Sequence, residues 1–448
     1  MLSLALPLAL AGISTPVLSL VETAVVGHLP GSHNLGAVAI GTTVFNYVYW
    51  AFSFLRMSTT ALTAQAVGAD RPDEVRASFA RALLVALALG VTLVALGGPL
   101  RWLAFTLLPV SEQVRARADE YVAIRLWSAP AAFVSYALLG FFMGLSRPRL
   151  AMVMEVLRGV VYVPLAFVLV KRLEGGVAGV ATASVAAEWT AVLVSGGVAW
   201  ALLARLPSRS SHGALGAPPE DRAPVSRAAW WRRAVLDRRA LWRLFAINRD
   251  LFVRTQCLLV VFATFAARGA AMGDDTLAAN AVLMSLYLLV AYGLGAFAQA
   301  ASALVGTAVG AGERVGLWRA VRTTTAWAVG VAAASSLVLA ALGERFLAML
   351  TDAPAIRELA ATYLPHAAAL PVVAVLSFQL DGAAIGATRT VLLRNVLLVA
   401  LASYAVAHVT LVPLVGNHGL WLSFSTFMLV RSAGFFLFVR ALRRDGER

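Results

Sequence analysis

Cysteine and charge are both scarce in this sequence. Cys257 is the single cysteine among 448 residues, which excludes an intramolecular disulfide and a metal site built from cysteines. Charged residues make up 13% of the chain, whereas a typical soluble domain has about 25%. The six histidines show no spacing typical of metal ligands, so no metal site is predicted.

Nucleotide-binding and hydrolase motifs are missing as well. The sequence has no Gly-x-x-x-x-Gly-Lys-Ser/Thr loop, no His-Glu-x-x-His and no Gly-x-Ser-x-Gly. These absences argue against an ATP-driven pump and against a membrane enzyme, and no cofactor is expected.

Long apolar runs are what the sequence has in abundance. Hydrophobic residues make up 60% of the chain, and a helix needs about 20 consecutive apolar residues to cross a bilayer. Outer-membrane barrels show short alternating strands instead, so that class is excluded. The net charge of +14 comes from arginines in short segments between the apolar runs, a pattern typical of cytoplasmic loops and not of nucleic-acid binding.

The apolar runs predict an all-α membrane protein with twelve transmembrane helices in two six-helix bundles. The first bundle is expected within residues 1–204 and the second within 241–448, joined by a cytoplasmic linker at 205–240 that is rich in Pro, Ser, Gly and Arg. The predicted helices lie at about 2–27, 35–61, 78–101, 120–145, 150–172, 176–204, 241–269, 276–301, 320–343, 359–386, 390–413 and 418–441.

Lysine and arginine concentrate on one side of this topology. They lie in the even-to-odd helix loops, in the linker and at the C-terminus. The positive-inside rule makes that side cytoplasmic, with both termini on it. We therefore expect a multi-pass protein of a bacterial inner (plasma) membrane.

The two halves repeat one another at an almost constant offset. Ala66-Val67-Gly68-Ala69 recurs as Ala308-Val309-Gly310-Ala311, and Gly140, Gly144 and Arg147 recur as Gly382, Gly386 and Arg389. Because each half has an even number of helices, both enter the membrane from the same side, as in a parallel repeat. Such a duplicated, pseudo-symmetric unit favours a transporter that works by alternating access.

Several longer stretches are family-specific. They run from Phe54 to Ala69, from Leu277 to Met284 and from Leu380 to Arg389, with Glu22 to Leu29 near the start. In these stretches the chain resembles the multidrug and toxic compound extrusion (MATE) family, in its DinF-like branch. The resemblance implies twelve helices in two bundles around a V-shaped cavity, and export driven by inward H⁺ or Na⁺.

The sequence also departs from that family in three places. The acid of the first helix is Glu22 where the family usually has Asp, and Tyr162 and Ala166 stand where the fifth helix usually presents Asn and Asp. Ser302 stands in place of a Glu of the eighth helix. Fewer carboxylates make a Na⁺ site built from several acids less favoured, so we expect coupling to H⁺ through one or two acids.

The candidates for cation or proton coupling are Glu22, Asp381 and Asp250. A charged side chain at membrane depth costs about 2.5–3.5 kcal/mol on insertion scales, so such residues are functional candidates by default. Glu22 is alternatively an interfacial acid with its head group in water. Asp381 is expected in the middle of a helix, bound to a cation, a proton or an arginine. Asp250 and Arg254, four residues apart, are expected to form a pair on one helix face.

Six polar or aromatic residues are candidates for the substrate cavity. They are Arg56, Gln65, Tyr47, Asn280, Tyr292 and Gln299. The alternative is a packing role for Arg56 and Gln65, and packing or lipid contact for Tyr47 and Tyr292. Glu188 and Arg431 occupy matching places in the two halves and are expected to join helices. Arg158 is expected to extend toward a membrane interface.

These inferences favour an antiporter that exports small amphipathic, often cationic, organic compounds. The alternative is a flippase for lipid-linked precursors, which would need a cavity rich in Arg or Lys for a pyrophosphate. The expected partners are organic small molecules and the lipid bilayer, without nucleic acid, and the expected state is a monomer. Substrate identity and the choice between H⁺ and Na⁺ are left open by the sequence.

Overall fold

The structure is a computed structural model that describes residues 32–107, 111–207 and 234–444. Glu22, the helix predicted for 2–27 and most of the predicted linker lie outside these residues. Within them the chain is helical, and no strand is formed. Helix is the expected outcome in hydrocarbon, because every backbone N–H and C=O must find a partner inside its own segment.

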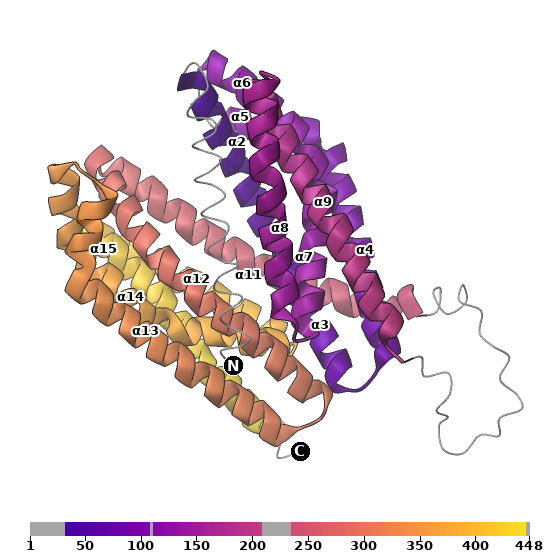
Figure 1. The fold of residues 1–448 in the computed structure, drawn as a ribbon. Helices are drawn as coiled ribbons and strands as arrows, with labels where there is room; N and C mark the ends of the chain where they lie inside the picture. Colours follow the sequence, from indigo (N-terminus) through magenta and orange to yellow (C-terminus); the bar gives the residue numbers. More distant parts are fainter. Residues whose placement is uncertain (1–31, 108–110, 208–233, 445–448) are drawn as a thin grey trace, which may run out of the picture. The chain divides into compact units, whose positions relative to one another are not determined.

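On either side of residues 206–237 the helices follow one another with short connections (Figure 1). In the first part of the chain they are α2 (Ser32–Ala51), α3 (Phe54–Gly68), α4 (Pro72–Ala95), α5 (Gly97–Leu107), α6 (Glu112–Arg125), η1 (Leu126–Ser128), α7 (Ala129–Gly144), α8 (Pro148–Phe167), the π-helical turn η2 (Val168–Arg172) and α9 (Gly176–Arg205). In the second part they are α11 (Arg238–Ala271), α12 (Asp274–Gly310), α13 (Arg314–Leu350), α14 (Pro354–Gly386) and α15 (Thr390–Arg444).

Proline and left-handed residues set several helix boundaries. Helices α4, α8 and α14 each begin at a proline, whose fixed φ and missing N–H suit the first helical turn. Ser146 and Thr388, which follow α7 and α14, both have positive φ, at 56° and 53°. These two residues lie at positions that the sequence repeat relates to one another.

Several predicted helices differ from the observed elements. The span predicted at 78–101 covers parts of both α4 and α5. The span predicted at 35–61 is interrupted by a turn at Phe52 and Ser53, which separates α2 from α3. The last two predicted spans are continuous as α15, but Val415 and Gly416 have non-helical φ and ψ angles. That break lies between the predicted ends at 413 and 418.

Ten helical segments within the described part of the chain are long and apolar enough to cross a membrane. The last of them, α15, has 55 residues and contains the break at Val415 and Gly416. A straight helix of that length would extend about 80 Å at 1.5 Å per residue, which is long enough for two membrane crossings of about 30 Å each.

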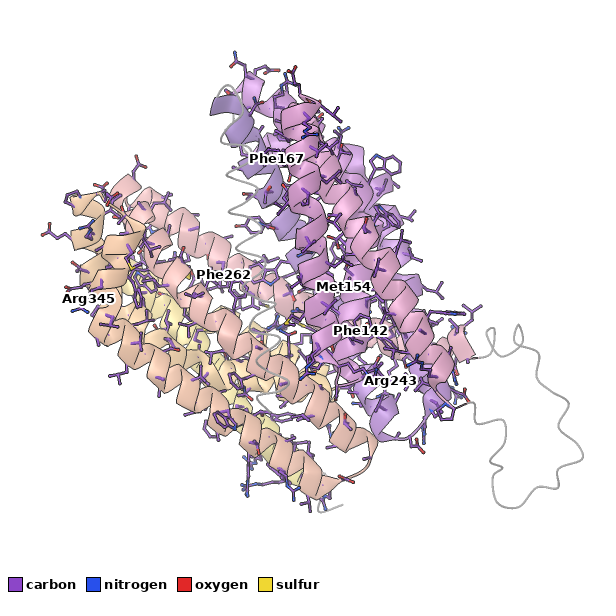
Figure 2. All side chains as sticks on the ribbon, viewed as in Figure 1. Phe142, Met154, Phe167, Arg243, Phe262 and Arg345 are labelled. Atoms are coloured by element: carbon purple, nitrogen blue, oxygen red, sulfur yellow. The ribbon has the colours of Figure 1, made fainter. Side chains whose placement is uncertain are left out.

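The chain divides into two compact units. We call the described residues up to Ala246 the N-terminal unit and those from Ile247 onward the C-terminal unit. In the N-terminal unit, α7 packs against α3, α4 and α9. Phe142, labelled on α7 in Figure 2, is almost fully buried there.

Glycines let α7 approach α3 closely. A Cβ atom added at Gly140 would lie 2.5 Å from the carbonyl oxygen of Arg56, and one added at Gly144 would lie 2.5 Å from Cβ of Thr63. Side chains larger than hydrogen would force these two helices apart.

The C-terminal unit is organised around α14, which packs against α12, α13 and α15. A Cβ atom added at Gly382 would lie 2.2 Å from the carbonyl oxygen of Ala298, and one added at Gly386 would lie 2.4 Å from that of Ser302. The contact between Gly382 and Ala298 is the repeat equivalent of the contact between Gly140 and Arg56, so the same close approach occurs once in each unit.

Candidate functional site

Asp381 is the acid at the centre of an ionic cluster inside the C-terminal unit. It lies in the last two turns of α14, which ends at Gly386, and not in the middle of the helix as the sequence predicted. Its Oδ2 atom accepts hydrogen bonds from Nη2 of Arg254 on α11 and, at 3.0 Å, from Nη2 of Arg431 on α15. Three helices are thereby joined through one carboxylate oxygen.

This cluster is buried and carries more positive than negative charge. The side chains of Asp381, Arg254 and Arg431 are 7%, 8% and 2% exposed. Asp381 therefore balances only one of its two guanidinium partners. Of the three alternatives that the sequence left open for Asp381, the structure shows pairing with arginine.

Three polar atoms of the cluster have no hydrogen-bond partner among the described residues. They are Oδ1 of Asp381, Nε of Arg254 and Nε of Arg431. Arg431 is further surrounded by soft groups, with its Cζ 5.3 Å from the ring centroid of Phe427 and its Nη1 3.2 Å from the sulfur of Met428. Polarisable sulfur and an aromatic face partly compensate a guanidinium group that has few oxygen partners.

Asp250 forms a second ionic cluster on the same unit. Its Oδ1 accepts hydrogen bonds from Arg394 at 2.8 Å and from Arg249 at 3.0 Å, and its Oδ2 accepts one from the hydroxyl of Thr390 at 3.1 Å. The predicted pair of Asp250 with Arg254 is wrong, because each of these residues is bonded to other groups. Tertiary contacts with α14 and α15 prevail over the helical spacing of four residues.

The N-terminal unit contains an ionic cluster of the opposite sign. Glu188 on α9 accepts a hydrogen bond from Ser135 at 2.6 Å and pairs with Arg158 at 3.4 Å. Arg158 also pairs with Glu155 at 2.6 Å, one turn earlier on α8. Arg158 therefore lies between two acids and does not extend freely toward a membrane interface, which corrects the sequence expectation.

Glu188 and Arg431, which match in the repeat, both join helices as predicted. Their surroundings differ in net charge. The ion pairs around Glu188 contain two acids and one arginine, whereas those around Arg431 contain one acid and two arginines. The two units are thus electrostatic opposites at corresponding places.

The predicted cavity residues of the N-terminal unit lie on α2 and α3. Tyr47 on α2 is 46% exposed. Arg56 and Gln65, both on α3, are half-buried. The side-chain oxygen of Gln65 accepts a hydrogen bond from Arg243 at 3.3 Å.

The predicted cavity residues of the C-terminal unit all lie on α12. Asn280 is buried in a reciprocal amide pair with Asn417, with both bonds at 2.8–2.9 Å, and its oxygen also accepts a hydrogen bond from Trp421. A substrate could reach Asn280 only by replacing one of these bonds. Tyr292 is 48% exposed and Gln299 is half-buried, so both are more accessible.

Aromatic packing surrounds the amide pair. Phe265 contacts Trp421 edge-on with the ring centroids 5.1 Å apart, and Phe262, labelled on α11 in Figure 2, contacts Phe424 in the same way at 5.5 Å. Edge-to-face contacts of this kind stabilise a buried interface beyond their area. They fix α11 against the second segment of α15.

Two features of the structure were not predicted. His366 on α14 and His418 on α15 share a hydrogen bond between Nε2 and Nδ1 at 3.0 Å. An arginine was among the partners considered for Asp381, but Arg254 and Arg431 were not identified, because three charges from three helices show no common spacing. The sequence signal that points to the cluster is the apolar run around Asp381 and around Arg431. Within the described ranges no group of three or more His, Cys, Asp or Glu residues could hold a metal ion.

The fold and the buried ionic clusters define a polytopic membrane protein with charged groups inside its helical bundles. A model of the MatE family matches residues 7–168 and 254–414 of the chain. The chain therefore belongs to the MatE family.

Curated relatives extend over nearly the whole chain. DNA damage-inducible protein F of Escherichia coli K12 is 36% identical over 446 residues, which covers 99% of this chain and 92% of that protein. A probable multidrug resistance protein NorM of Neisseria meningitidis serogroup A is 28% identical and covers 81% of this chain and 75% of that protein. These homologues support a multidrug efflux transporter and do not favour a flippase.

Solved structures share the fold. A MATE transporter of Vibrio cholerae superposes with a TM-score of 0.83 at 17% identity, covering 98% of this chain and 96% of that one. A MOP superfamily transporter from Pyrococcus furiosus superposes with a TM-score of 0.80 at 18% identity, covering 99% and 95%. The resemblance to the MATE family and to its DinF-like branch, inferred from the sequence, is confirmed.

Proposed function

We propose that this protein is a cation-coupled antiporter that exports small amphipathic, often cationic, organic compounds by alternating access, with H⁺ as the coupling ion in preference to Na⁺. The observation that carries the proposal is the match to transporter relatives along nearly the whole chain. The scarcity of acids supports H⁺, because the described residues offer no group of carboxylates that could enclose a metal cation.

We place the coupling acid at Glu22. The other two candidates, Asp381 and Asp250, are each bound by two guanidinium groups. Release of such an acid requires its arginines to find another anion. We therefore propose that Asp381 and Asp250 exchange their arginine partners during the transport cycle, and that neither of them carries the transported proton.

We further propose twelve spanning helices in two pseudo-symmetric bundles, residues 1–204 and 241–448, joined by a cytoplasmic linker at 205–240. The ten apolar segments, the break in α15 and the helix predicted at 2–27 support that number. The paired glycine contacts at Gly140 and Gly382 support the symmetry. The protein is placed in a bacterial inner membrane as a monomer, with both termini cytoplasmic.

Reconstitution in liposomes tests the proposed function. Separate pH and Na⁺ gradients are imposed while transport of a fluorescent organic cation is followed. The proposal expects transport with the pH gradient alone, and Glu22→Gln should abolish it. Transport driven only by Na⁺, or transport that ignores both gradients, contradicts the assignment of H⁺.

A further inference from the structure

Four arginines of the C-terminal unit form a series from its surface to its interior. The side chains of Arg249 and Arg394 are 50% and 25% exposed, whereas those of Arg254 and Arg431 are 8% and 2% exposed. Arg249 and Arg254 lie on α11, and Arg394 and Arg431 lie on α15. The exposed fraction of the arginine side chain therefore falls from the outer pair to the inner pair.

The series contains too few acids to balance it. Asp250 receives the two outer arginines, and Asp381 receives the two inner ones. Asp381 is the carboxylate that pairs with Arg431, and no second carboxylate forms an ion pair with Arg431 within the described ranges. Among the described residues, the inner end of the series therefore keeps one unbalanced positive charge.

An unbalanced charge at that depth is costly. Removing one partner from a buried ion pair strongly destabilises a protein, and arginine in a transmembrane helix is tolerated only with a partner or water. The cluster also retains polar atoms without hydrogen-bond partners in the described part of the chain, namely Nε of Arg254, Nε of Arg431 and Oδ1 of Asp381. Donors and charge both remain available for one more anion.

A fourth polar group lies close by in the sequence of α14. Gln379 is 1% exposed, and neither its amide nitrogen nor its amide oxygen has a hydrogen-bond partner among the described residues. Buried amides are normally bonded, and an exception calls for a ligand or water. Gln379 and Asp381 are two residues apart and do not face the same side of α14, so this amide is separate from the cluster, and the inference depends on the arginines alone.

We propose that Arg254 and Arg431 bind the carboxylate group of an organic substrate. This inference rests on the proposed function and specifies its substrate class as amphipathic compounds that carry a carboxylate. Arginine presents paired N–H donors that match the two oxygens of a carboxylate. Asp381 then acts as the resident anion, which holds both arginines when no substrate is bound and shares them when it arrives.

The charge of the cluster selects this ligand. A monoanion neutralises the one unbalanced charge, whereas a dianionic phosphate would leave a net negative charge in the same buried place. A lipid headgroup is disfavoured by the burial of both arginines, because its acyl chains must remain in the bilayer. Phe427 lies beside Arg431 as an apolar, aromatic neighbour.

A matched pair of dyes tests the proposal. One is a fluorescent xanthylium dye with a free benzoate, and the other is the methyl ester of the same dye, which lacks the negative charge. Binding of each dye to the full-length purified protein is measured by fluorescence polarisation, and export is measured in phosphatidylcholine liposomes that contain no anionic lipid. The variants are Arg431→Gln, Arg254→Gln and Arg431→Lys, with Arg440→Gln as the control at an exposed position of α15.

The wild-type protein should bind the carboxylate dye about 10-fold to 100-fold more tightly than its ester, as expected for a hydrogen bond to a charged group of about 1.5–3 kcal/mol. Arg431→Gln and Arg254→Gln should reduce this ratio to about 1, because each leaves Asp381 with a single arginine. Arg431→Lys should retain part of the preference, and Arg440→Gln all of it. Arg431→Gln retains a balanced pair, so its thermal unfolding midpoint should not fall.

Equal binding of the two dyes by the wild-type protein would overturn the proposal, as would an unchanged ratio in both glutamine variants. The proposal is supported if chloride abolishes the preference for the carboxylate dye at the same concentration in the wild-type protein and in Arg440→Gln. Arg431→Gln should then show no preference for either dye. Gradient-driven export of the ester with no Arg431-dependent carboxylate preference would refute the carboxylate site alone. Absence of export of either dye would refute the proposed function, even where the binding ratio is intact.

Discussion

Asp381 illustrates how an acid is accommodated inside an apolar helix. Its Oδ2 atom holds Arg254 and Arg431 together, so its removal affects three helices at once. Desolvation of the three charged groups is offset by their mutual attraction only while the acid is present. The role of Asp381 in stability is therefore larger than that of an exposed aspartate.

The substitution Asp381→Asn should destabilise the protein by about 3–5 kcal/mol, because it leaves two buried arginines without their carboxylate. The measurement is the thermal unfolding midpoint of the purified protein in detergent. Asp352→Asn, at a fully exposed side chain, is the control and should leave the midpoint unchanged. The double variant Asp381→Asn with Arg431→Gln should recover part of the loss. Equal midpoints for Asp381→Asn and wild type would show that the ion pairs are not needed for stability.

Helix contacts through glycine determine the packing at the scale of elements. Gly382 touches the backbone of α12, whereas a methyl group added at Gly293 on α12 would have nothing within 4 Å. The same substitution should therefore have opposite effects at these two positions. At Gly382 the added methyl group would meet a neighbouring helix, whereas at Gly293 only the difference in helix propensity between glycine and alanine counts.

Gly382→Ala should destabilise the C-terminal unit by about 1–3 kcal/mol, since a methyl group would overlap the carbonyl of Ala298. Gly293→Ala should stabilise it by about 0.8–1.0 kcal/mol, the difference in helix propensity between the two residues. Both effects are read from thermal unfolding midpoints. A fall for Gly293→Ala as large as that for Gly382→Ala would contradict the observed contact.

The stability of the first turn of α11 should depend on pH through the carboxylate of Asp237. Backbone N–H groups of Ala240 and Arg239 bond its carboxylate, at 3.1 Å and 2.7 Å, and hold the pKa of Asp237 below its usual value. Because the pKa of Asp237 is lower in the folded protein, its capping hydrogen bonds contribute fully at pH values above the unfolded pKa of about 3.9. This contribution is lost as the pH falls through the folded pKa.

Amide hydrogen exchange at Arg239 and Ala240 should therefore increase as the pH is lowered below about 4, relative to the intrinsic rate at each pH. Asp237→Asn keeps a capping side chain without a titrating group, so its relative exchange should be independent of pH in this range. The same acid-dependent increase in the Asn variant would show that Asp237 is not the group responsible.

Apolar run length was enough to predict where most of the helices from α7 to α15 lie, because each membrane span needs about 20 apolar residues. It did not predict their full length, since α11 to α14 have 33 to 37 residues. The turn between α2 and α3 was not predicted, since Phe52 and Ser53 continue the apolar run without a proline or glycine. The pairing of Asp250 was mispredicted for a related reason. Spacing on one helix says which residues could meet, but Arg394 and Thr390 come from another helix.

The charged residues of the candidate site were identifiable from the sequence, but their partners were not. Asp381 and Arg431 stand out in apolar runs. Their meeting with Arg254 depends on how α11, α14 and α15 pack, which one-dimensional periodicity does not contain. The predicted Glu22 lies outside the described residues and stays a prediction.

Topology is the first prediction at the scale of the whole molecule. The distribution of arginines places the loop between α12 and α13 in the cytoplasm and the loop between α13 and α14 on the opposite side. In a Cys257→Ala background, a cysteine introduced by Asp352→Cys should react with a membrane-impermeant maleimide in intact cells, and one introduced by Glu313→Cys should react only after lysis. The reverse pattern would invert the proposed orientation.

Coupled exchange is the property that the proposed antiporter function requires of the whole molecule. Relatives that align with most of the chain include multidrug resistance proteins, and the fold is shared with solved MATE transporters. Exchange is reciprocal by thermodynamic necessity: if a proton gradient drives the organic cation, a gradient of the organic cation must drive protons the opposite way.

The most direct test is therefore to measure proton movement that is driven by substrate alone. Proteoliposomes with an entrapped pH-sensitive dye, at equal pH and Na⁺ on both sides, receive a sudden gradient of an organic cation. The account predicts that, in the wild-type protein, protons move in the direction opposite to the organic cation and the internal pH changes accordingly. In Glu22→Gln the internal pH should not change. Substrate movement without any proton movement in the wild-type protein would contradict it.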